Sequence, residues 1–319
     1  MATLNLPDVQ LSYQQLGQGV PVTLIHGLGT NMAFWYLGPG RLMMQQAQLL
    51  IYDLRGHGAS SMPPSGYTLD RMVADLAALH DALGITQTHL VGHSYGARVA
   101  LAYAAQYPER VKSLTVADTQ IRSLQPPMTL AEWPYWSRWK ADLLAAGAQG
   151  LPDDDELIDF RLLADLSQHM GGGRGAKGGA APKRRINMNS RRMGERGQKR
   201  WETLLAETTA KAELQDEGAL DEQTLSAIQV PTLLMYGKLS HCVPTSDILL
   251  DLMPNSRRVL IPEAGHFFPV VKPRLFARSF AGFLAVTGET ADGTGPGGQR
   301  VRLRRRPLQR ARRRAGDAL

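Results

Sequence analysis

The chain has 319 residues, a net charge of +7 and a single cysteine, Cys242. One cysteine excludes an internal disulfide, and no apolar run approaches the ~20 residues of a membrane span. The first residues lack a basic segment followed by an apolar one, so we expect a cytoplasmic protein without a signal peptide. The length favours one large α/β domain with an insertion over two unrelated domains.

The positive charge is concentrated in two stretches. Residues 174–200 contain ten Lys or Arg and one acid, and residues 300–314 contain nine Arg and no acid, which leaves 17 basic against 28 acidic residues elsewhere. Basic stretches attract polyanions, but these two lack the interleaved aromatic residues on which bases stack. The sequence therefore argues against nucleic-acid binding as the main role. A disordered tail is the simpler explanation of residues 287–319.

Short apolar runs alternate with helical patterns along the chain. The predicted strands are residues 10–14, 20–25, 49–53, 89–92, 113–117, 232–236 and 258–261. Between the third and fourth, apolar residues recur at spacings of three and four from Leu69 to Leu79, which predicts a helix with a buried stripe. This alternation predicts an α/β fold with a mostly parallel central sheet and helices on both faces.

The pentapeptide Gly-His-Ser-Tyr-Gly at residues 92–96 carries the strongest functional signal. It follows the apolar run 88–91 and precedes a helical pattern over 97–107. A serine on a sharp turn between strand and helix exposes its hydroxyl, and the two glycines permit close backbone approach. The pattern predicts that Ser94 is a nucleophile, with a structural serine in a tight turn as the alternative.

Three more loops follow predicted strands. His-Gly-Leu-Gly at residues 26–29 ends the second strand, a Gly-rich loop at 53–60 follows the third, and a loop at 262–267 containing His266 follows the last. With the pentapeptide, these spacings resemble the α/β-hydrolase superfamily over roughly residues 3–286. The resemblance implies that His266 is the general base and that the backbone N–H groups of Leu28 and Tyr95 form the oxyanion hole. Histidine suits the base because its ordinary pKa is about 6.5.

The catalytic acid departs from the commonest pattern of this superfamily. After strand 232–236 that pattern has Gly, two further residues and then Asp. In this chain, Ser240 occupies the position of that Asp. Some members carry the acid after the preceding strand, where Asp118 stands, and geometry rather than sequence position decides which carboxylate serves. We therefore predict Asp118. A capping role for Asp118, the weaker candidates Asp247 and Asp251, and a Ser-His pair without an acid remain open.

The alternation of short apolar runs with helical patterns stops after Asp118 and resumes at residue 230. We therefore predict a hydrolase core at 1–118 and 230–286, with a helical cap inserted at 119–229. The insertion includes a basic low-complexity loop near 171–200. Large aromatic residues in a lid suggest an apolar pocket. We expect Phe267 and three tryptophans to contact substrate; alternatively, the tryptophans hold the cap to the core. These tryptophans are Trp133, Trp136 and Trp139.

These features predict a serine hydrolase that cleaves a carboxylic ester, with an apolar acyl or alcohol group, through an acyl-enzyme intermediate. No cofactor or metal is expected, because no histidines share a ligand spacing with a carboxylate or thiolate on one helix. One alternative is a thioesterase that docks an acidic carrier protein on basic residues 183–185 and 191–192. Another is a non-catalytic, receptor-like binding protein. Carbon–carbon bond hydrolysis and perhydrolysis also remain open.

Overall fold

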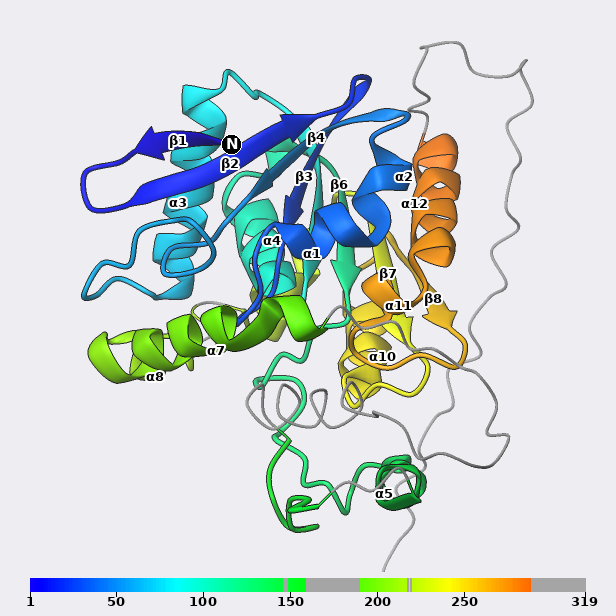
Figure 1. The fold of residues 1–319 in the computed structure, drawn as a ribbon. Helices are drawn as coiled ribbons and strands as arrows, with labels where there is room; N and C mark the ends of the chain where they lie inside the picture. Colours follow the sequence, from blue (N-terminus) through cyan, green and yellow to red (C-terminus); the bar gives the residue numbers. More distant parts are fainter. Residues whose placement is uncertain (146–148, 159–189, 217, 219, 288–319) are drawn as a thin grey trace, which may run out of the picture.

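The computed structural model describes residues 1–145, 149–158, 190–216, 218 and 220–287 (Figure 1). Its centre is an eight-stranded sheet in the order β1-β2-β4-β3-β5-β6-β7-β8. The strands are β1 (Ala2–Asn5), β2 (Gln10–Leu16), β3 (Val20–Ile25), β4 (Ala47–Tyr52), β5 (Thr88–His93), β6 (Val111–Ala117), β7 (Thr232–Gly237) and β8 (Ser256–Ile261). β1 and β2 are antiparallel to their neighbours and the other pairs are parallel, which confirms the predicted mostly parallel sheet.

The predicted strands are all present, and each ends within about two residues of its expected limits. β1 was not predicted. It is a short, mostly exposed edge strand that pairs with β2 from Ala2 opposite Tyr13 to Asn5 opposite Gln10. An edge strand with little buried surface carries no apolar pattern, so its pairing partner rather than its sequence defines it.

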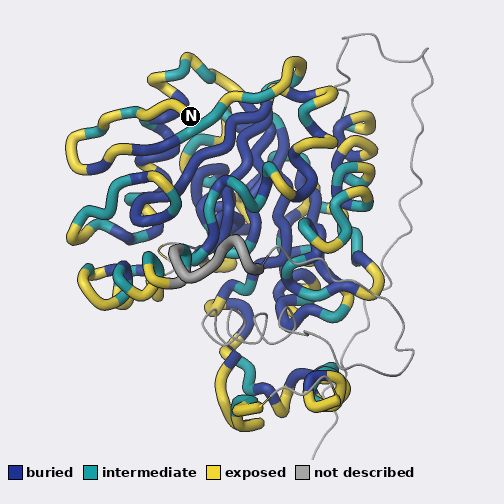
Figure 2. Tube along the Cα trace, in the orientation of Figure 1, coloured by how far each residue is buried: buried dark blue, intermediate teal, exposed yellow. Residues whose placement is uncertain are grey.

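Helices cover both faces of the sheet, as predicted. One face carries α3 (Leu69–Ala82), α4 (Tyr95–Gln106) and α10 (Val243–Leu252), and the short η2 (Pro108–Arg110) links α4 to β6. The other carries α1 (Ala33–Trp35), η1 (Tyr36–Gly40), α2 (Arg41–Met43), α11 (Phe268–Val271) and α12 (Pro273–Thr287). Figure 2 shows the central strands buried between these layers. None of the described helices combines the length and apolar character needed to cross a bilayer.

The segment between β6 and β7 contains α5 (Trp136–Ala145), α7 (Ser190–Glu207), α8 (Ala210–Glu213) and α9 (Glu222–Ser226). In Figure 1, α7 crosses below the carboxyl ends of the strands, and α5 lies farther from the sheet. A small separate core surrounds Trp133 and Trp136. By contrast, Leu225 and Ile228 pack into the same core as α3 and α4. The end of the segment is therefore built onto the body of the fold.

The prediction of a basic loop near 171–200 is wrong for residues 190–200, because these residues lie in α7. Arg, Lys, Gln and Glu are good helix formers, and the helix is anchored at its far end by Leu204, which is fully buried in the main core. Composition alone suggested a solvated stretch, because residues 190–200 are rich in charge and the residue that anchors the helix, Leu204, comes after them. Residues 171–189 and the predicted tail from 288 onward lie outside the described residues.

A buried ion pair fixes the loop that follows β4. The Arg55 side chain is completely buried, and its Nε and Nη2 atoms donate to the two carboxylate oxygens of Asp75 at 2.7 and 2.6 Å. Its Nη1 atom donates to Asp8 at 3.1 Å. The guanidinium thus ties this loop to α3 and to the chain between β1 and β2.

We predict that Arg55→Met lowers the free energy of unfolding by about 3–5 kcal/mol, because it leaves the buried Asp75 carboxylate without its cation. Urea unfolding followed by circular dichroism measures the change. The double variant Arg55→Met/Asp75→Leu is the matched control and should recover part of the loss, since it removes both charges. An unchanged unfolding midpoint in Arg55→Met would contradict this account of the loop.

Five of the buried histidines have a pKa that burial lowers. Burial lowers the pKa of His26 and His80 to about 4, and that of His57, His93 and His241 to about 3. Between those values and the ordinary value of about 6.5, the unfolded chain binds more protons than the folded one. We predict that the free energy of unfolding decreases as the pH falls from about 6.5 toward 4. Denaturant unfolding at several pH values tests this; a constant value across that window would refute it.

Candidate functional site

The predicted site residues meet at the carboxyl edge of the sheet. Ser94 follows β5 and Asp118 follows β6, its neighbour, whereas His266 follows β8. The Ser94 N–H donates to the carbonyl of Ala117 at 3.0 Å, and the Asp118 N–H donates to that of Met235 at 2.9 Å. The register of adjacent parallel strands therefore aligns the residues, and this edge is where open α/β sheets bind ligands.

Ser94 occupies a strained turn between β5 and α4. Its φ of 55° and ψ of −122° lie outside the regions that L-residues ordinarily adopt, and α4 begins at the next residue. A Cβ atom on Gly92 would lie 2.2 Å from the Gly96 carbonyl oxygen, and one on Gly96 would lie 2.3 Å from that of Ile25. Both positions therefore require glycine, which explains the spacing of the pentapeptide.

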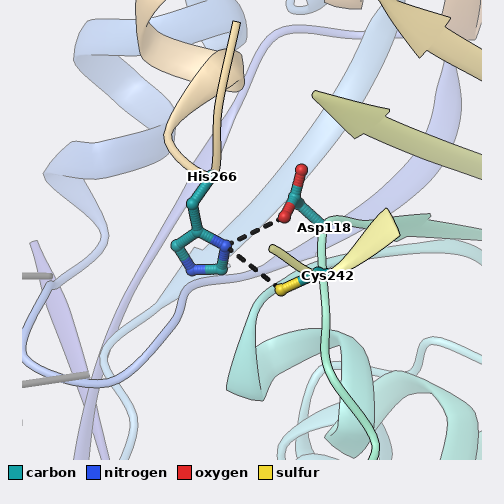
Figure 3. A group of neighbouring side chains, drawn as sticks. All are labelled: Asp118, Cys242 and His266. Carbon is teal, nitrogen blue, oxygen red and sulfur yellow. Dashed lines mark hydrogen bonds and ion pairs between the residues drawn. The ribbon is translucent and has the colours of Figure 1, made fainter. Parts of the chain in front are cut away.

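Figure 3 shows His266 facing Asp118. The Nδ1 atom of His266 lies 3.0 Å from Oδ1 of Asp118, which is fully buried. The Gly237 N–H donates to Oδ2 at 2.7 Å, and the Ser240 hydroxyl donates to Oδ1 at 2.5 Å. Ser240 thus stands where the common pattern has its acid and hydrogen bonds the acid supplied from β6.

Opposing effects act on the Asp118 carboxyl. Burial raises its pKa, but the His266 imidazole, the Ser240 hydroxyl and the Gly237 N–H together lower the pKa below its ordinary value. The carboxylate is therefore ionised near neutral pH. It can hold the His266 ring in one orientation and stabilise an imidazolium.

His93 connects the turn at Ser94 to the loop of His266. Its Nε2–H donates to the His266 carbonyl at 2.9 Å, and its ring stacks on Phe34 with centroids 4.5 Å apart. Within the described residues, the Ser94 hydroxyl makes no direct hydrogen bond to His266. Such bonds are often long before ligand binds and tighten in the complex. Sequence analysis assigned His93 no role, because its partner lies 173 positions away.

The predicted oxyanion turn lies against Ser94. A Cβ atom on Gly27 would lie 2.9 Å from the Ser94 Cβ atom. The His26 Nδ1–H donates to the Gly27 carbonyl at 2.8 Å, and its Nε2 accepts from the Leu54 N–H at 3.1 Å. Because burial lowers the pKa of His26 to about 4, the ring is neutral and can make both bonds. The turn next to Leu28 is therefore fixed in shape.

Asp53 braces the other side of this turn, a role that sequence analysis missed. Its Oδ1 accepts from the Met32 N–H at 2.7 Å, and its Oδ2 accepts from the Ala59 N–H at 2.8 Å. The guanidinium of Arg200 from α7 donates to the carbonyls of Gly56 and Ser60 in the same Gly-rich loop. The position of Asp53 between a buried strand and that loop was the available signal.

The predicted substrate-binding aromatic residues divide into two groups. Phe267 and Trp133 lie on the side of His266: the Phe267 ring centroid is 5.1 Å from that of His266, and Trp133 donates to the Leu239 carbonyl at 3.2 Å. Trp136 is buried in the small core and donates to Asp154 at 2.6 Å, and Trp139 packs between the other two tryptophans. Trp136 therefore packs within the inserted segment, whereas Trp133 connects that segment to the loop after β7.

The alternative acids lie away from the imidazole. Asp247 on α10 pairs with Arg258 of β8 and is exposed. Asp251 is also exposed on α10. Of the three carboxylates considered, Asp118 is the one that the structure brings to His266.

A cavity of about 570 Å³ lies beside the oxyanion turn. Its walls include residues 29–33, from the last residue of that turn to the start of α1, residues 56–59 of the Gly-rich loop, and Arg200, Trp201 and Leu204 of α7. Neither Ser94 nor His266 lines it. The cavity therefore lies between the turn and α7, and it is separate from the site at Ser94.

Cys242 lies next to His266, which the sequence did not reveal. Its buried Sγ atom is 3.8 Å from the His266 Nδ1 (Figure 3). The same sulfur lies 3.3 Å from the His241 Nε2. In the part of the chain that the structure describes, Asp118, Cys242 and His266 are a group whose metal-ligating atoms all lie within 4.8 Å of one another.

Comparison with known proteins identifies the family. Residues 20–273 match the family model for the alpha/beta hydrolase fold. A 2-hydroxymuconate semialdehyde hydrolase of Pseudomonas putida is 27% identical over 84% of this chain and 88% of its own length. A cis-3-alkyl-4-alkyloxetan-2-one decarboxylase of Shewanella oneidensis is 35% identical over 39% of this chain and 41% of its own.

Solved structures agree on the fold. The enol-lactonase from Burkholderia xenovorans superposes with a TM-score of 0.60 at 20% identity, covering 89% of this chain and 99% of that one. The family match spans most of the sequence, including the turn of Ser94, Asp118 and the loop of His266. The chain therefore belongs to the alpha/beta hydrolase fold family.

Proposed function

We propose that this protein is a serine hydrolase that cleaves carboxylic esters through an acyl-enzyme intermediate. The observation that carries the proposal is the 3.0 Å contact between the His266 Nδ1 and the buried Asp118 carboxylate, at the same sheet edge as the strained turn of Ser94. The hydrolase from Pseudomonas putida supports hydrolysis as the reaction type. The decarboxylase relative is a reason to test the reaction directly.

In the first half-reaction, the Ser94 Oγ attacks the ester carbonyl carbon while the His266 Nε2 accepts the hydroxyl proton. Asp118 accepts the hydrogen bond of Nδ1–H and stabilises the resulting imidazolium. The carbonyl π electrons move to oxygen, and the backbone N–H groups of Leu28 and Tyr95 stabilise this oxyanion. When the tetrahedral intermediate collapses, the alcohol leaves with the proton from Nε2 and the acyl group remains on Ser94.

Water completes the cycle by the same steps. His266 removes a proton from water as its oxygen attacks the acyl carbonyl, and the same oxyanion hole stabilises the second intermediate. Collapse breaks the bond to Ser94, which recovers its proton from the imidazolium, and releases the carboxylic acid. A serine nucleophile excludes the aspartyl-ester route, which would need a carboxylate at position 94.

The surroundings of the imidazole favour an apolar acyl or alcohol group. Phe34 stacks on His93, Phe267 lies edge-on to His266, and Trp133 approaches His241 with ring centroids 6.4 Å apart. Aromatic surface beside a reacting centre favours apolar ligands. Within this proposal, residues 119–229 act as a cap, through α7 across the oxyanion side and Trp133 on the histidine side.

A fluorophosphonate probe should label the full-length chain at Ser94, because the reagent reacts with a serine whose proton is removed by a neighbouring base. Peptide mapping by mass spectrometry locates the adduct, and Ser94→Ala provides the unlabelled control. A chain that stays unlabelled while hydrolysing no p-nitrophenyl ester from acetyl to palmitoyl would instead indicate a binding protein that retains the fold.

We predict that Asp118→Asn lowers kcat for the best p-nitrophenyl ester by ~10³ to 10⁴, because an amide neither stabilises the imidazolium nor selects the correct tautomer. The Ser240 hydroxyl already touches the Asp118 carboxylate, so Asp118→Asn/Ser240→Asp should regain at least ~10-fold by moving the charge to a neighbouring strand.

Asp118→Asn/Ser240→Asn is the matched control and should regain nothing. Steady-state kinetics on the three variants, with circular dichroism to verify folding, distinguishes these outcomes. Turnover close to that of the parent in Asp118→Asn would remove Asp118 from the mechanism.

A further inference from the structure

We propose that Asp118, Cys242 and His266 form a zinc-binding site, and that zinc bound there switches the hydrolase off. Asp118 follows β6, Cys242 is the N-cap residue of α10, and His266 lies in the loop after β8. They offer a carboxylate, a thiolate and an imidazole, which are the three common protein ligands of Zn²⁺. The binding stands on these contacts alone, whereas the inhibition rests on the proposed function.

The spacing of the ligand atoms matches a metal site. Zn–S and Zn–N bonds of about 2.3 and 2.0–2.1 Å separate bound sulfur and nitrogen by roughly 3.5 Å in a tetrahedron. The Cys242 Sγ lies 3.8 Å from the His266 Nδ1, and that nitrogen lies 3.0 Å from the Asp118 Oδ1. In Figure 3, Nδ1 points toward both the carboxylate and the sulfur. A cation could therefore join all three after small side-chain shifts.

Binding exchanges protons for the cation. The thiol and the Nδ1–H group each release a proton to solvent, and Zn²⁺ forms bonds to the thiolate, the imidazole nitrogen and the ionised Asp118. The ion enters beside His266, the one member of the group with measurable exposure, at 9%.

Occupation of the site would disable the general base. A neutral imidazole bound to metal through Nδ1 carries its proton on Nε2, so Nε2 becomes a donor and has no lone pair for the Ser94 proton. Asp118, bound to the cation, also no longer orients the ring. Zinc therefore removes the base without touching the nucleophile, and chelation restores it.

The binding experiment uses Cd²⁺ on the full-length Ser94→Ala variant, which carries the proposed site but no nucleophile. Cys242 is the only cysteine, so a sulfur-to-cadmium charge-transfer band in the ultraviolet can come from this residue alone. We expect the band to saturate at about one cadmium per chain, to fall on addition of zinc, and to be absent in Ser94→Ala/Cys242→Ala. No band at saturating cadmium would overturn the site.

The inhibition experiment measures ester hydrolysis by the parent and Cys242→Ala chains, each relative to its own metal-free rate. We expect zinc to abolish most of the parent rate, EDTA to restore it, and Cys242→Ala to raise the half-inhibiting zinc concentration at least ~10-fold, since even outer-shell changes cost ~10 to 100-fold in affinity. Mg²⁺, which prefers oxygen ligands, is the control and should not inhibit.

The outcomes separate the two proposals. Equal zinc sensitivity of parent and Cys242→Ala overturns the switch, and Cys242→Ser replaces the alanine variant if the latter fails to fold. A cadmium band in a chain that hydrolyses no ester supports the metal site and counts against the proposed function. Ester hydrolysis that zinc does not inhibit, in a chain without a cadmium band, supports the proposed function and counts against the metal site.

Discussion

A carboxylate that is removed from water needs hydrogen-bond donors, and three segments of the chain supply them to Asp118. Gly237 at the end of β7, Ser240 just beyond it and His266 after β8 all contact this one side chain. Leaving such a buried charge unpaired would cost several kcal/mol. The contact between His266 and Asp118 therefore positions the imidazole and also stabilises the folded chain.

Buried hydrogen bonds also hold the opposite side of the site in place. His26 must stay uncharged to donate to Gly27 and accept from Leu54, and Asp53 links the same turn to the Gly-rich loop. Arg55 anchors that loop to α3. Backbone N–H groups stabilise an oxyanion efficiently only when they are already in position, and these buried contacts provide that preorganisation.

The family does not determine the reaction, and the inserted segment is where this chain can differ from its relatives. Part of the segment is structural: Trp136 fills a small core, and Leu225 and Ile228 belong to the main one. Other parts reach the site, because Arg200 holds the Gly-rich loop and Trp133 holds the loop of Leu239. A change in this segment would therefore alter substrate fit and the shape of the site together.

The sequence by itself determined the parallel strands, their order along the chain, and the turns of Ser94 and His266, because apolar runs and glycine positions act over a few residues. It could not find β1 or α7, whose definition depends on partners elsewhere in the chain. The sequence favoured Asp118 without excluding the other acids, and only the tertiary structure brought Asp118, Cys242 and His93 beside His266. Those contacts join residues 24 to 173 positions apart, and the distance between such residues is set by strand register and loop packing rather than by any local pattern.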